Sequence, residues 1–289
     1  MINWRPTRIA VLQIVIVGML SLPIVGAPIF PDESIDALEG VGITEHLDQQ
    51  IPLNLTFVDE FGNDVLLSDF FDGEKPIIIT LNYYRCPMLC SLTLNGLTTG
   101  MMDMEWTLGN EFDVVTISIN PDEDAELAMT NKKGYVGHYD RVGAENGWHF
   151  LTGEQESITA IADSIGFGYV FDDKSGEFLH TATIIFMTPD GRISKYMNDV
   201  KFAAKDLRFA LIEASEGRIG TALDTLLLFN CFVYDPDSNS YVPSAKKLMR
   251  TGGALMLLML IGGLAVLKWT TPERLRAKKA HTQMDGNNS

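Results

Sequence analysis

Short apolar runs alternate with longer amphipathic segments through the middle of the chain. The short runs are rich in β-branched residues and are bounded by glycine, proline or asparagine, which predicts buried strands. The longer segments place apolar residues three or four positions apart, which predicts helices packed on those strands. In chain order we expect a strand at 53–58, a strand at 76–81, a helix at 91–108, a strand at 113–119, a helix from 122, a strand at 148–152, a helix at 154–165, an extended piece at 169–171, strands at 181–187 and 192–196, and a helix at 205–214.

Turn and capping residues mark where several of these elements meet. Gly166 is placed to end a helix at its C′ position, where glycine tolerates a left-handed backbone. The acidic run at 122–126 suits the first turn of a helix, because carboxylates favour the positive end of the helix dipole. Pro189-Asp190-Gly191 predicts a hairpin turn between the last two strands. Strands that alternate with helices and end in a hairpin predict an α/β fold with a central mixed sheet flanked by helices.

An apolar stretch near the N-terminus follows two arginines, Arg5 and Arg8. This is the layout of a secretory signal or an N-terminal anchor, which we assign to residues 1–27. The small residues at 25–27 favour cleavage and Pro28 opposes it, so both outcomes stay open. Either one predicts that the following domain is exported.

A second apolar stretch, residues 251–267, contains no charge and predicts a transmembrane helix. Its length corresponds to about 26 Å of helix, and the flanking Arg250 and Lys268 can extend to the two membrane surfaces. More lysine and arginine residues follow this stretch than precede it, so we expect the tail, residues 268–289, in the cytoplasm. The protein is then a cell-membrane protein with one C-terminal span and its main domain on the outer, periplasmic or extracytoplasmic, face.

Between these two segments we expect one main domain. Residues 28–50 are interpreted as a lead-in, residues 51–220 as the α/β domain and residues 221–250 as a juxtamembrane segment.

Composition excludes some classes of function. The chain has 289 residues, of which 46% are hydrophobic and 21% charged, as in ordinary folded proteins. The net charge is −16, and residues 28–245 alone carry −24, which repels phosphate backbones and argues against nucleic-acid binding. Three cysteines are too few for a disulfide scaffold in a chain of this length.

Two of those cysteines, Cys86 and Cys90, come directly after the predicted strand at 76–81. Four-residue spacing at the start of a helix places their Cβ atoms about 5–6 Å apart on one face, within reach of a disulfide or of a two-thiolate metal clamp. The helix N-terminus and Arg85 both favour thiolate over thiol. Two thiolates with few other ligands select a soft ion, and Cu(I) fits best among common metals.

Three motifs together resemble the SCO/SenC family, thioredoxin-like proteins that deliver copper to the CuA site of cytochrome c oxidase. They are Tyr84-Arg85-Cys86-Pro87-Met88-Leu89-Cys90, then Ser118-Ile119-Asn120-Pro121-Asp122, and a histidine before the strand that ends in Pro189-Asp190-Gly191. The resemblance covers residues 50–215 and implies a thioredoxin-like fold. It also implies that Cys86, Cys90 and His180 bind copper.

The chain departs from the family pattern at two positions. Many members carry aspartate where this chain has Asn120, and aspartate before the histidine where this chain has Leu179. The imidazole of His180 therefore lacks that neighbouring carboxylate as an orienting partner. The Cys-x-x-Cys motif of thioredoxin-type reductases and the nucleophile motif of related peroxidases are both missing from the sequence.

We therefore expect a copper chaperone rather than an enzyme. Its partners would be the oxidase subunit that carries the CuA site, a copper donor protein and a thiol reductant, since an oxidising compartment would close Cys86 and Cys90 into a disulfide. The first alternative is a thiol-disulfide oxidoreductase that reduces the cysteines of the oxidase subunit. The second is a redox or copper sensor that signals through residues 268–289.

Overall fold

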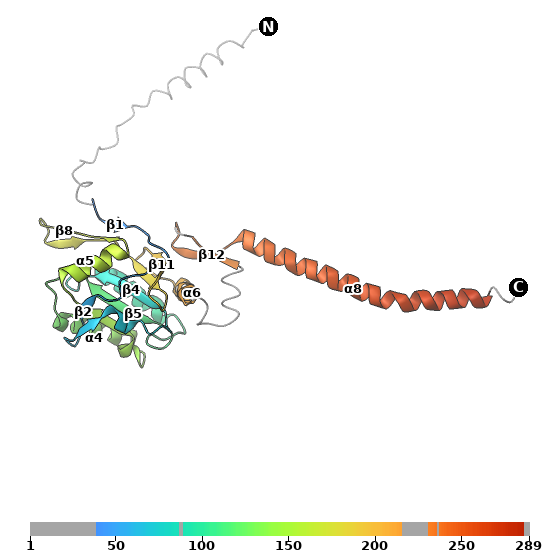
Figure 1. Ribbon diagram of the computed structural model, residues 1–289, viewed down its shortest axis with the longest axis horizontal. Helices are drawn as coiled ribbons and strands as arrows, with labels where there is room; N and C mark the ends of the chain where they lie inside the picture. The colour runs from blue at the N-terminus through green and yellow to red at the C-terminus, as the bar shows by residue number, and fades with distance from the viewer. Residues whose placement is uncertain (1–38, 87–88, 216–230, 236, 286–289) are drawn as a thin grey trace, which may run out of the picture. The chain divides into compact units, whose positions relative to one another are not determined.

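The computed structural model describes residues 39–86, 89–215, 231–235 and 237–285 (Figure 1). By its internal contacts the chain divides into two units, Met1–Glu39 and Gly40–Ser289. The second unit holds every element described below. The expected signal or anchor at 1–27 lies outside the described residues.

A five-stranded mixed sheet forms the centre of the domain (Figure 1). The inner strands β4 (Ile77–Asn82) and β5 (Asp113–Ser118) are fully buried, and β5 pairs in parallel with both β4 and β6 (Trp148–Leu151). On the other side of β4, β10 (Ile184–Met187) runs antiparallel and continues through the predicted hairpin into β11 (Ile193–Met197). The strand order is β11, β10, β4, β5 and β6.

Helices cover both faces of this sheet. Because side chains alternate along a strand, Ile78 of β4 faces one hydrophobic core and Ile77 and Ile79 face the other. The first core is closed by α3 (Leu89–Met102), α4 (Ala125–Tyr139) and α6 (Ala204–Ala214), and the second by α5 (Gln155–Ser164). This arrangement of helices on a mixed sheet with a late hairpin is the predicted thioredoxin-like fold.

Most of the predicted elements are confirmed, and the exceptions have local causes. Gly166 has a φ of +64° just after α5, as expected for a C′ residue. The helix predicted at 91–108 ends at Met102, because the Arg141 guanidinium donates to the carbonyl oxygens of Met102, Met104 and Trp106 and holds that segment in a turn. The strand predicted at 53–58 is shorter and forms β2 (Thr56–Val58), which pairs with β3 (Asp64–Leu66).

Several small elements were not predicted, because each is too short to carry a hydrophobic period of its own. Strand β1 (Gly42–Ile43) lies in the segment interpreted as a lead-in and pairs with β7 (Phe167–Gly168). Strand β9 (Glu177–Leu179) forms a hairpin before His180 with β8 (Val170–Asp172), which is the extended piece predicted at 169–171. A third pair, β12 (Phe232–Asp235) and β13 (Ser240–Pro243), lies in the juxtamembrane segment. Two 3-10 helices complete the description, η1 (Leu67–Phe70) and η2 (Ala144–Asn146).

The chain continues into one long helix, α8 (Ala245–Asp285). Its first part, Ala245–Trp269, contains an 18-residue stretch with a mean hydropathy of 1.8 and is long and apolar enough to cross a membrane. This stretch contains the span predicted at 251–267.

Candidate metal centre

The first candidate ligand, Cys86, lies in the loop that leaves the carboxyl end of β4. Its backbone N–H donates to the carbonyl oxygen of Tyr83 at 3.2 Å, so the chain turns sharply there. The side chain is half-buried and packs against the core that contains Tyr83. Cys90 is the second residue of α3, as predicted, but its side chain lies outside the described part of the structure, as do residues 87–88.

A buried carboxylate holds the backbone of this loop. Glu123 is only 5% exposed, and its two oxygens accept the backbone N–H groups of Tyr84 at 2.7 Å and Arg85 at 2.9 Å. The hydroxyl of Ser118, at the end of β5, donates to the same carboxylate at 2.7 Å. Two charge-assisted hydrogen bonds thus fix the two residues that precede Cys86, and a third, from Ser118, holds the carboxylate in place.

The side chain of Tyr84 anchors the same loop from the other side. Its hydroxyl lies 2.7 Å from the carbonyl oxygen of Leu151 and 3.1 Å from that of Thr116. Burial raises the pKa of Tyr84 well above its ordinary value, and the nearby carboxylates of Glu123 and Glu60 raise it further. The hydroxyl therefore stays protonated and remains a hydrogen-bond donor to backbone carbonyls of β5 and β6.

The second candidate ligand, His180, lies between β9 and β10 and is 8% exposed. Its ring meets the ring of Tyr83 edge-on, with centroids 6.1 Å apart, and lies 5.8 Å from the ring of Phe167. These aromatic contacts restrict how the imidazole can rotate.

A backbone carbonyl decides which nitrogen of His180 carries the proton. The Nδ1 atom lies 2.9 Å from the carbonyl oxygen of Thr181. A carbonyl oxygen can only accept, so a hydrogen bond there requires the proton on Nδ1 and, in the neutral ring, places the lone pair on Nε2. Thr181 thus supplies the orienting partner that Leu179, in the place of an aspartate, does not.

Tyr83 is the residue that connects the two candidate ligands. Its carbonyl oxygen receives the N–H of Cys86 and its ring contacts His180. Among the described residues no group of three or more His, Cys, Asp or Glu side chains is gathered for a metal ion, and Cys90 is not in that comparison. The full set of Cys86, Cys90 and His180 stays a prediction.

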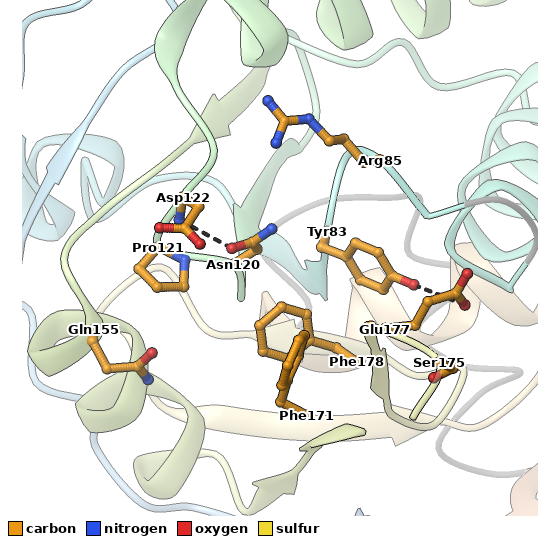
Figure 2. A pocket seen from close by; sticks show the side chains of 11 residues that line it. Tyr83, Arg85, Asn120, Pro121, Asp122, Gln155, Phe171, Ser175, Glu177 and Phe178 are labelled. Carbon is orange, nitrogen blue, oxygen red and sulfur yellow. Dashed lines mark hydrogen bonds between the residues drawn. The ribbon is translucent and has the colours of Figure 1, made fainter. Parts of the chain in front are cut away.

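A pocket of about 590 Å³ opens beside the loop (Figure 2). Tyr83 and the β8–β9 hairpin residues Phe171 and Phe178 supply its aromatic part, with Phe171 and Phe178 ring centroids 5.0 Å apart. The Tyr83 hydroxyl points toward Glu177 at 3.4 Å, as Figure 2 shows. The polar lining consists of Arg85, Asn120, Asp122, Gln155, Ser175 and Glu177.

Three consecutive acidic residues at 122–124 have three different roles, which the sequence did not separate. Asp124 caps α4 by accepting the N–H of Leu127 at 2.9 Å, as an acidic helix start predicts. Asp122 is exposed on the pocket rim, whereas Glu123 turns inward to the cysteine loop. The sequence predicted only a helix start for Glu123 and did not indicate that its carboxylate holds the cysteine loop.

The third cysteine, Cys231, precedes β12 and is a half-buried free thiol. Its backbone carbonyl accepts the N–H of Ser244 at 2.7 Å across the hairpin. The backbone of Cys231 thus extends the β12–β13 hairpin by one contact.

The SCO1/SenC family model matches residues 44–211, which is more than half of the chain. The chain belongs to the SCO1/SenC family. The match confirms the resemblance stated from the cysteine, Ser-Ile-Asn-Pro-Asp and histidine motifs. It ends before β12, so the β12–β13 hairpin and α8 lie outside the region shared with the family.

Solved structures are similar to the family domain in fold. A putative electron transfer protein from Aquifex aeolicus has 24% identity and a TM-score of 0.52, over 59% of this chain and 95% of that one. Arabidopsis thaliana ScoI, solved with copper bound, has 18% identity and a TM-score of 0.45, over 56% of this chain and 96% of that one. Bradyrhizobium japonicum ScoI with copper bound has 23% identity and a TM-score of 0.42, over 57% and 98%. No curated protein sequence matches the chain significantly.

Proposed function

We propose that this protein binds copper through Cys86, Cys90 and His180 and delivers it to the subunit of cytochrome c oxidase that carries the CuA site. One observation carries the proposal. His180 is nearly buried beside the cysteine loop, and the contact of its Nδ1 atom with the Thr181 carbonyl leaves Nε2 as the metal-binding nitrogen.

The chemistry of the donor set fits copper. Thiolates and an imidazole are the ligands that copper prefers over hard oxygen donors, and two thiolates favour Cu(I). Glu123 and Tyr84 fix the backbone before Cys86, so this part of the site needs little reorganisation when a metal binds. The thiolates could also close into a disulfide, so copper loading requires a thiol reductant in an oxidising compartment.

The pocket beside the loop is where a partner would approach. Its aromatic part and its mixed charged rim resemble the composition of protein contact surfaces more than that of a buried core. The apolar part of α8 would hold the domain at the outer membrane face, which raises the concentration of the site near a membrane-bound oxidase subunit. A copper donor protein would meet the same face of the domain.

The test is copper binding by the full-length protein in detergent micelles under reducing conditions. We expect about one Cu(I) per chain for a single site of this ligand set. Cys86→Ser, Cys90→Ser and His180→Ala should each lower the affinity by at least about tenfold, while the exposed-histidine control His138→Ala should not change it. Equal affinity of the His180→Ala variant would refute the three-ligand site. Disulfide reductase turnover that survives His180→Ala would instead favour the thiol-disulfide oxidoreductase.

A further inference from the structure

A directed series of hydrogen bonds leads away from Thr181, the residue that holds His180. The hydroxyl of Thr183 donates to the side-chain oxygen of Asn198 at 2.8 Å. Thr181 and Thr183 hydroxyl oxygens lie 3.2 Å apart. Because Thr183 has one hydroxyl proton and gives it to Asn198, the proton between the two threonines comes from Thr181. The series therefore runs in one direction, from Thr181 to Thr183 to Asn198.

Asn198 is an exposed residue just after β11, and a second asparagine holds it in place. Asn239 accepts the backbone N–H of Asn198 at 3.2 Å and donates its side-chain amide to the Asn198 carbonyl at 3.0 Å. Asn239 lies in the turn between β12 and β13 with a φ of +44°, a left-handed conformation that asparagine tolerates. The side-chain amide of Asn239 thus pairs with the backbone N–H and carbonyl of Asn198, as the backbone of a neighbouring strand would.

The β12–β13 hairpin can supply this support because it is itself fixed to the domain. The N–H of Tyr241 donates to Asp206 at 2.8 Å, and the Lys205 ammonium donates to the Tyr241 carbonyl at 2.8 Å. The Tyr234 hydroxyl reaches the carbonyl of Tyr196 in β11 at 3.0 Å. The Tyr234 hydroxyl also lies 3.2 Å from the side-chain oxygen of Asn239. The two contacts of Tyr241 with α6 do not involve Asn239, so they keep the hairpin attached when the Asn239 side chain is removed.

We propose that the β12–β13 hairpin acts through Asn239 as a positioning element for His180. Asn239 fixes Asn198, Asn198 holds the hydroxyl of Thr183, and Thr183 holds Thr181, whose carbonyl orients the imidazole. This rests on the proposed role of His180 in copper binding. The hairpin lies outside residues 44–211, the part of the chain that the family model matches.

The experiment uses the full-length protein in detergent micelles with two variants that break the series at different points. Asn239→Gly removes the side chain and keeps the left-handed backbone accessible. Thr183→Val removes the hydroxyl at nearly constant volume. Ser238→Ala is the control, because Ser238 lies in the same turn but its hydroxyl bonds Asp235 and Ser240 instead.

Two quantities are measured for each variant. The first is the rate at which diethylpyrocarbonate modifies His180 in metal-free protein, read by mass spectrometry against the exposed His138 as an internal reference. The second is the Cu(I) affinity, measured by competition with a chelator. The modification rate and the Cu(I) affinity of each variant are compared with those of the wild type. The thermal unfolding midpoint is measured as well, to show that the variant is as stable as the wild type.

We expect both variants to speed modification of His180 relative to His138 and to weaken Cu(I) binding by about three- to tenfold, less than the loss of a direct orienting partner, because both act on His180 through Thr181. The double variant should be no worse than the more affected single variant, because both changes break one series. Wild-type values in both single variants would overturn the proposal, as would fully additive effects. If His180→Ala leaves copper affinity unchanged, the proposed function fails, and the modification rates alone then decide whether the hairpin positions His180.

Discussion

The carboxylate of Glu123 accepts the backbone N–H of Arg85 at 2.9 Å, one residue before Cys86. It is the only acid of the 122–124 run that is buried. The position of the cysteine loop thus depends on a side chain from the start of the next strand-to-helix connection. The same buried carboxylate therefore contributes to the stability of the fold and sets the position of Cys86.

Replacing Glu123 with glutamine should lower both the stability of the domain and its affinity for Cu(I). The amide presents an N–H group to a backbone N–H that needs an acceptor, so one buried donor loses its partner at a cost of about 1–3 kcal/mol. We expect a lower free energy of unfolding in urea and a Cu(I) affinity reduced by about tenfold. Asp122→Asn, in the exposed neighbour, is the control and should change neither. An unaltered affinity in Glu123→Gln would contradict the positioning of Cys86 by Glu123.

Phe171 offers a test of partner docking that is separate from metal binding. It is 49% exposed on the β8–β9 hairpin and lines the pocket beside the loop. Phe171→Ala should leave the Cu(I) affinity unchanged and slow copper transfer to the purified oxidase subunit by about tenfold, the usual effect of removing an aromatic contact of 1–2 kcal/mol. Phe61→Ala is the matched control, because Phe61 is 69% exposed and lies near Lys132 instead of the pocket. Equal slowing in both variants would argue against docking at the pocket.

His149 should make the stability of the domain depend on pH. Burial lowers the pKa of His149 below its ordinary value of 6.5, with Glu60 opposing and Lys132 adding to the effect. Below pH 6.5 the unfolded chain binds a proton that the folded chain does not, so the free energy of unfolding falls by up to about 1.4 kcal/mol per pH unit. Between pH 7.5 and 5.5, urea unfolding of wild type should show a larger loss than His149→Gln, which does not titrate. Parallel losses in the two proteins would rule His149 out as the cause.

Two glycines in helices should respond oppositely to alanine. A Cβ on Gly96 of α3 would lie 2.0 Å from the carbonyl oxygen of Val200, whereas a Cβ on Gly134 of α4 meets no atom within 4 Å. Gly96→Ala must push α3 away from the segment after β11 and should lower the free energy of unfolding by more than about 2 kcal/mol. Gly134→Ala should raise it by about 0.5–1 kcal/mol, since alanine favours a helix. Equal midpoints in urea for the two variants would contradict this close packing.

The order of elements and the cysteine loop could be predicted from the sequence because their signals are local. The apolar run at 76–81 identified β4, and Cys90 lies at the start of α3, as expected. Cys86 was expected at the start of the same helix but lies in the loop before it. The family motifs placed His180 just before β10 for the same reason, since each motif is read within a few residues.

Elements that depend on distant partners could not be predicted in this way. Strands β1 and β7 have two residues each, so only their pairing identifies them. The β12–β13 hairpin gained its place from contacts with Asp206 and Tyr196, which lie more than thirty residues away.

By itself the sequence determined the thioredoxin-like class, the family and the residue types offered to a metal, because periodicity, turns and motif spacing are properties of neighbouring residues. Only the tertiary structure decided that Glu123 holds the cysteine loop, that the Thr181 carbonyl replaces the missing aspartate, and that Asn239 reaches Asn198. Each of these depends on which oxygen or N–H group a folded backbone brings within hydrogen-bond distance. The direction of a backbone carbonyl is set by the folded backbone and cannot be predicted from residue types alone.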